Sequence, residues 1–172
     1  NQDTLTILNI EGVEPSATSV EDGSYALARP LFIYSDATIM QEKPQVAAYI
    51  NFFLSNVNEV IDEVGYFPSS AAALNGAKQA WANAQNVSLG GGQTAGVTLP
   101  AVDPLAVSGD VVSAGSSTVF PLAEAVAELF RNEGYSDNIT IDSIGSGAGL
   151  ERFCVAGETD VANASRPNRD SE

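Results

Sequence analysis

The second half of the chain repeats one unit, which consists of a short apolar strand, a turn of Gly and Ser, and an amphipathic helix. The first copy is VVSAGSSTVFPLAEAVAELFRNEG (residues 111–134), and the second is NITIDSIGSGAGLERFCVAG (residues 138–157). A third apolar run, DVANAS (residues 160–165), leads directly into Arg166. Strands that alternate with helices at this spacing indicate an α/β fold with a parallel sheet.

The Gly/Ser turns predict a site for a small anion. The carboxyl ends of parallel strands form the ligand crevice of an open sheet, and the helix N-termini there expose N–H groups. Gly lets the backbone approach a ligand closely, and Ser or Thr adds hydroxyl donors. One such turn is more often structural, but two turns followed by Arg166 favour an anion site.

Better-known motifs do not fit the same residues. GSGAG lacks the spacing of the G-x-G-x-x-G dinucleotide fingerprint, and no GK[ST] follows it as in a phosphate-binding P-loop. The chain has no G-x-S-x-G motif and no His, which excludes Ser-His-Asp and Cys-His catalysis and removes the commonest zinc ligand. We therefore expect no enzyme, no metal site and no cofactor.

The first half of the chain predicts two strands and two helices. TLTILNI (residues 4–10) and RPLFIYS (residues 29–35) have the composition of strands. A long helix is expected from Pro44 to Gly65, because its apolar residues recur on one stripe: Val46, Ile50, Phe53, Leu54, Val57 and Ile61. A shorter helix is expected over residues 70–84, with Leu74 and Trp81 as its large apolar residues.

Charge and length narrow the class of protein further. The 172 residues carry a net charge of −15, which argues against nucleic acid as a partner. No apolar run is long enough to span a bilayer, and no secretory signal is recognisable at the start of the sequence.

Some other residues are given structural interpretations. Glu124, Glu128 and Glu133 are interpreted as a solvated helix face and Arg152 as a surface charge. The single cysteine, Cys154, shares helical spacing with Leu150 and is expected in the core.

Three blocks of the second half resemble the first lobe of periplasmic phosphate-binding proteins, the capture subunits of phosphate ABC importers. They are AGSSTVFPLAEA, IDSIGSGAGLERF and GETDVANASR. The resemblance implies an extracytoplasmic protein that binds inorganic phosphate or a similar oxyanion and works with the importer's membrane subunits. It also implies which residues hold the phosphate, and these are Ser117, Thr118, Val119, Ser146, Gly147, Ser165 and Arg166.

One of these residues departs from the best-known family pattern. Some members carry an Asp after the third strand, where it accepts the phosphate proton and helps to reject sulfate. This chain has Arg166 at that place, as in another branch of the family. Since a cation pairs with either anion, selectivity for phosphate over sulfate cannot rest on a carboxylate there.

The first half resembles the closing segment of the same family, which returns to complete the first lobe. The sequence therefore predicts one domain in three parts: the family's C-terminal segment (1–85), a Gly/Pro-rich linker (86–109) and the family's N-terminal segment (110–172). The expected fold is a single three-layer α/β lobe, flavodoxin-like, with a mostly parallel sheet and a circularly permuted order. The second lobe is missing.

Two functions remain open at this point. The first is a phosphate-binding lobe that binds phosphate weakly or not at all, because half of the donors are absent. The alternative is an autonomous, engineered fold unit whose exposed cleft face drives self-association into a homodimer. A natural split or permuted gene is the alternative to engineering.

Overall fold

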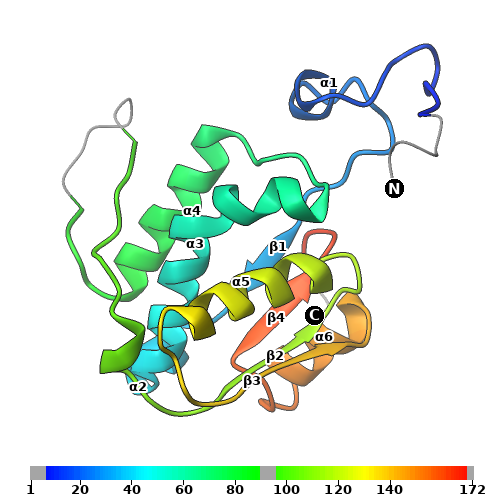
Figure 1. Ribbon diagram of the computed structural model, residues 1–172. Coiled ribbons are helices and arrows are strands. Elements are labelled where there is room, and N and C mark those ends of the chain that lie inside the picture. The colour runs from blue at the N-terminus through cyan, green and yellow to red at the C-terminus, as the bar shows by residue number, and fades with distance from the viewer. Residues whose placement is uncertain (1–6, 90–95, 170–172) are drawn as a thin grey trace.

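A four-stranded sheet in the order β1-β4-β2-β3 forms the centre of the computed structural model, which describes residues 7–89 and 96–169 (Figure 1). β2 (Val111–Gly115) lies between β3 (Ile139–Ser143) and β4 (Val161–Ala164) and is parallel to both. β1 (Phe32–Tyr34) pairs with β4 in the antiparallel direction. The predicted α/β fold with a mostly parallel sheet is confirmed.

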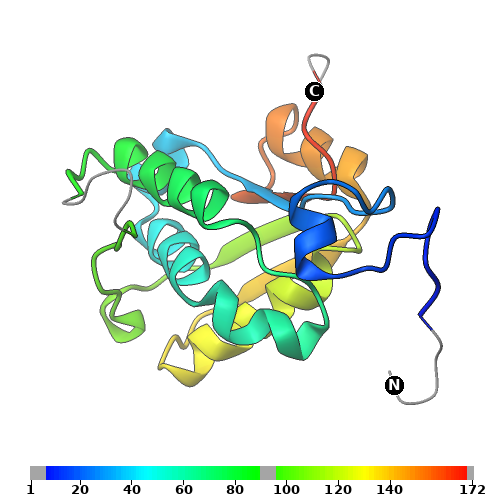
Figure 2. The same cartoon turned by 90° about the horizontal axis from the view of Figure 1, so that it is seen from above.

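Helices cover both faces of this sheet and make three layers. α3 (Pro44–Val64) and α5 (Phe120–Asn132) pack against each other on one face, and α4 (Ala71–Ala84) packs on the outer side of α3. Among the described helices, α6 (Ser146–Cys154) covers the other face, where it contacts β2 and β4 (Figure 2). α5 follows β2 and α6 follows β3, and the two helices lie on opposite faces of the sheet.

The core between the sheet, α3 and α5 explains why both long helices form. Val46, Ile50, Phe53, Leu54 and Ile61 of the predicted α3 stripe are buried, and Val57 is half-buried against the same core. On α5 the apolar periodicity predicts a buried face of Leu122, Val126, Leu129 and Phe130, of which Leu129 is half-buried and the others are buried. The ring of Phe130 lies 4.9 Å from that of Phe52 on α3, in a tilted arrangement.

The two halves of the chain meet inside this single lobe. Besides the β1–β4 pairing, the Lys43 ammonium lies 2.6 Å from the Asp160 carboxylate, whose side chain is only 4% exposed. The second Asp160 carboxylate oxygen accepts a hydrogen bond from the Val112 amide. A buried carboxylate at the start of β4 therefore depends on a cation from the other half.

Part of the predicted linker packs on the lobe. Leu99 is buried in the core, and the Asn51 side-chain amide donates to the Pro100 carbonyl at 3.1 Å. A short 3-10 helix, η2 (Pro104–Ala106), follows. Residues 96–109 thus contribute to packing, whereas residues 90–95 of the predicted linker lie outside the described residues.

Several short features differ from the sequence-based expectation. The strand predicted over residues 4–10 is wrong where it can be checked, because residues 7–9 are irregular and Ile10 only forms an isolated bridge to Val13. Residues 4–6 lie outside the described part. α1 (Ala17–Glu21) and α2 (Ala37–Glu42), not expected, begin at the side-chain caps Ser16 and Asp36. α1 is set apart from the layers in Figure 1.

The expectation for Cys154 is also wrong, because the thiol is exposed. Gly149 and Leu150 are the buried residues of α6, and Phe153 is half-buried against Ala162 and Ala164 of β4, whereas Cys154 is the last helical residue. The acidic face of α5 is confirmed, since Glu124 and Glu128 are exposed, and so is Glu133 beyond its end.

We predict that Lys43→Met lowers the free energy of unfolding by about 1–3 kcal/mol, because Asp160 would keep a buried charge without its cation. Lys78→Met is the matched control, since no ion pair of Lys78 is found among the described residues. Urea unfolding of both variants measures the difference. Equal losses for the two variants would contradict the role assigned to the ion pair.

Candidate functional site

The carboxyl ends of the three parallel strands lie level with one another. Gly115, the last residue of β2, pairs with Ser143 at the end of β3 and with Asn163 near the end of β4. Each strand then enters a segment that carries predicted site residues. The register therefore brings together the first turn (residues 116–119), the second turn (residues 144–147) and the pair Ser165–Arg166.

Backbone-to-backbone contact holds the first and second turns together. The amides of Ile144 and Gly145 both donate to the Gly115 carbonyl, at 2.9 and 2.8 Å. A Cβ atom on Gly149 would lie 2.4 Å from the Gly115 Cα, and a Cβ on Gly115 would lie 2.0 Å from the Asn163 carbonyl oxygen. Neither position has room for a side chain, so Gly149 allows the close approach of α6 to β2, and Gly115 allows that of β2 to β4.

The second turn contacts the end of β4 through predicted site residues. The Ser165 amide donates to the Ser146 hydroxyl at 3.1 Å, and the two hydroxyl oxygens lie 3.5 Å apart. A Cβ on Gly147 would lie 3.8 Å from the Arg166 Nη2 atom, so the guanidinium extends over this glycine. In the described part of the chain no side chain caps α6, which leaves its first-turn N–H groups available to an anion.

The first turn is more constrained than the sequence suggests. Ser117 is exposed and Thr118 is half-buried, but the Val119 side chain is buried in the core. The Thr118 amide donates to the Ser116 hydroxyl, and the Val119 amide donates to the Ser116 carbonyl. The hydroxyls of Ser117 and Thr118 are consequently better placed to meet an anion than these two amides.

Two residues that support the first turn were missed by the sequence analysis. The Tyr66 hydroxyl donates to the Thr118 carbonyl at 2.7 Å. Asn163 accepts the Ser116 amide through its carbonyl, and its fully buried side-chain amide donates to Ser113. A polar residue inside the apolar strand VANA was a usable signal for Asn163, whereas nothing in GYFP pointed to Tyr66.

The charges around the second turn are arranged in two groups. Arg152, expected as a surface charge, is half-buried and pairs with Asp142 at 2.7 Å and with Glu158 at 3.1 Å. The hydrogen bond to Asp142, and then that to Glu158, raises the pKa of Arg152. Arg166 is the basic side chain over Gly147, and one of its guanidinium nitrogens donates to the Pro167 carbonyl.

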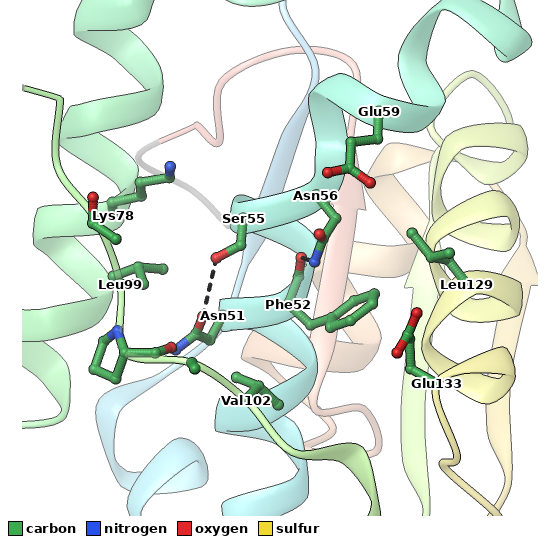
Figure 3. Close-up of a pocket in the computed structure, with 13 residues that line it drawn as sticks. Asn51, Phe52, Ser55, Asn56, Glu59, Lys78, Leu99, Val102, Leu129 and Glu133 are labelled. Carbon is green, nitrogen blue, oxygen red and sulfur yellow. Dashed lines mark hydrogen bonds between the residues drawn. The ribbon is translucent and has the colours of Figure 1, made fainter.

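A cavity of about 620 Å³ opens between α3, α4, α5 and the segment around Leu99, with Asn51, Ser55 and Lys78 on its wall (Figure 3). No predicted site residue lines this cavity. The predicted site residues lie instead at the edge of the sheet where the parallel strands end.

Residues 7–89 and 96–169 contain no group of His, Cys, Asp or Glu side chains that could hold a metal ion. No described helix is long and apolar enough to cross a membrane.

Residues 100–172 match the family described as the PBP superfamily domain. The SphX protein of Synechococcus elongatus is 52% identical over 62 residues, which are 36% of this chain and 18% of that protein. The phosphate-binding protein PstS of Staphylococcus haemolyticus is 39% identical over 83 residues, which are 48% of this chain and 25% of that protein.

A solved structure extends the similarity to nearly the whole fold. The phosphate-binding protein of a phosphate ABC transporter from Streptococcus pneumoniae superposes with a TM-score of 0.68 at 23% identity. The match covers 98% of this chain and 56% of that chain. The chain thus spans only part of the proteins that it resembles, and PstS and this transporter protein are named for binding rather than for catalysis.

We predict that Gly149→Ala lowers the free energy of unfolding by about 1–3 kcal/mol, because the new Cβ would collide with the backbone of β2. Gly147→Ala is the matched control, since its Cβ would make only an ordinary contact with Arg166. Urea unfolding compares the two variants. A Gly149→Ala protein as stable as the control would contradict the close approach described above.

Proposed function

We propose that this chain is an oxyanion-binding lobe whose ligand is inorganic phosphate. The observation that carries the proposal is the convergence of Ser146, Ser165 and Arg166 beside the first turn, at the carboxyl ends of three parallel strands. Hydroxyl, amide and guanidinium groups are the donors that an anion of this kind requires. The names of the PstS relatives and of the superposed transporter protein support phosphate as the ligand.

In this proposal phosphate is contacted by the Ser117 and Thr118 hydroxyls, by the Ser146 hydroxyl and the Gly147 amide, and by Ser165 and Arg166. Val119 contributes through its position at the start of α5, because its side chain is buried. Arg166 supplies positive charge but no acceptor for a phosphate proton, so we expect sulfate to compete.

We also propose that the order of the two halves is that of a circularly permuted first lobe. Residues 1–85 would complete the lobe begun by residues 110–172, and residues 86–109 would join them. Engineering and natural gene rearrangement both produce such an order. The lobe would act outside the cytoplasm, next to the membrane subunits of an ABC importer.

Affinity is expected to be low for these 172 residues alone. Each charge-assisted hydrogen bond that a second lobe would supply contributes about 1.5–3 kcal/mol, which is roughly a factor of ten or more in affinity. Solvent also has access to an open sheet edge. We therefore expect phosphate binding that is roughly millimolar or weaker.

Self-association is the second candidate. Ile144 in the second turn is 43% exposed, and Phe67, next to Tyr66, is 44% exposed. Exposed apolar side chains around the first two turns favour burial against another protein surface. A second copy of the chain would provide such a surface in a homodimer.

A phosphate titration followed by ¹H–¹⁵N NMR tests the proposed function on protein whose monomeric state is verified by light scattering. Shifts are expected at the first turn, the second turn and Ser165–Arg166. Ser146→Ala should weaken binding about tenfold, whereas Ser136→Ala, an exposed serine on the loop after α5, should not. Submicromolar affinity of a monomer would contradict the single-lobe proposal, and an unaffected Ser146→Ala would contradict the site. A dimer in the light-scattering measurement favours the second candidate.

A further inference from the structure

Tyr66 connects the end of the longest helix to the first turn. α3 ends at Gly65, which has the left-handed conformation with φ of 80°. The Gly65 amide donates to the Asp62 backbone carbonyl, and the Tyr66 amide donates to the Ile61 carbonyl at 3.2 Å. These bonds fix the backbone at Tyr66, and its half-buried ring packs against the core. The position of the Tyr66 hydroxyl is thus set by α3.

The Tyr66 hydroxyl contacts the backbone of a predicted ligand residue in the first turn. It donates to the Thr118 carbonyl at 2.7 Å, although the two residues are 52 positions apart. The Thr118 carbonyl and the Val119 amide form one peptide group, so a hydrogen bond to this oxygen orients the peptide plane and polarises the N–H. Tyr66 belongs to the first half of the chain, whereas every predicted site residue belongs to the second.

We propose that Tyr66 is a positioning residue for oxyanion binding, which holds the Thr118–Val119 peptide so that the Thr118 hydroxyl meets the ligand. This inference rests on the proposed function of the site. Tyr66 itself does not touch the ligand. Through its hydroxyl, the end of α3 acts on the anion site that the other half of the chain provides.

The test compares Tyr66→Phe with Tyr49→Phe. Both changes remove only a hydroxyl, and both hydroxyls lie on or next to α3 and donate to a carbonyl of the α5 region, since Tyr49 donates to Ala123 at 3.4 Å. Tyr49 lies in the core, and its hydroxyl bonds to Ala123 of α5 and not to a predicted ligand residue. A loss of phosphate affinity that came only from lower folding stability would appear in both variants. Urea unfolding measures how much stability each variant loses.

Two NMR readouts decide the outcome. Without phosphate, Tyr66→Phe should shift the Val119 amide proton and speed hydrogen exchange at residues 117–120, and Tyr49→Phe should leave these signals unchanged. With inorganic phosphate, Tyr66→Phe should weaken binding about fivefold, with the phosphate-induced shifts lost mainly at the first turn and retained at Gly147.

Each result bears on a separate claim. If the Tyr66→Phe protein binds phosphate as tightly as the wild type, or if its phosphate affinity falls no more than that of Tyr49→Phe, the positioning role is overturned. If the wild type shows no phosphate response at all, the proposed function fails, and the exchange rates then decide whether Tyr66 holds the turn. Unchanged exchange at residues 117–120 in Tyr66→Phe would overturn the inference on its own.

Discussion

The contact between the end of β2 and the first turn of α6 determines the geometry of the candidate site. A Cβ atom on Gly149 would collide with Gly115, and the Gly115 carbonyl accepts two amides from the second turn. If α6 lay farther from the sheet, Ser146 would lose its contact with Ser165 and Gly147 would move away from Arg166. The donors are therefore positioned by backbone packing.

Around this contact, the two halves of the chain supply different parts of one lobe. The second half provides the three parallel strands and the predicted ligand residues, and the first half provides α3, α4 and the antiparallel β1. Burial of Phe52, Phe53 and Phe130 between α3 and α5 drives their association without specifying direction. Specific contacts then fix the arrangement, namely the Lys43–Asp160 ion pair and the hydrogen bond from Tyr66 to Thr118.

Periodicity and turn composition were sufficient to predict the α/β fold, the long helices and the strands of the second half. Pro44, Gly65 and Pro121 mark helix ends through local backbone preferences, so these helix ends can be predicted from a single sequence. Features that depend on distant packing were missed or wrong. Cys154 has the spacing of a buried residue, yet it is exposed at the end of α6, and the path of α6 is set by tertiary contacts. The support from Tyr66 joins residues far apart in the sequence, which no local pattern reveals.

A crystal structure grown in phosphate at a concentration well above its dissociation constant tests the central claim most directly. The account predicts tetrahedral density at the carboxyl ends of β2, β3 and β4, in contact with Ser146, Arg166 and the first turn. A structure with that edge of the sheet open to solvent and no anion bound there, or with phosphate bound only elsewhere on the molecule, would contradict it.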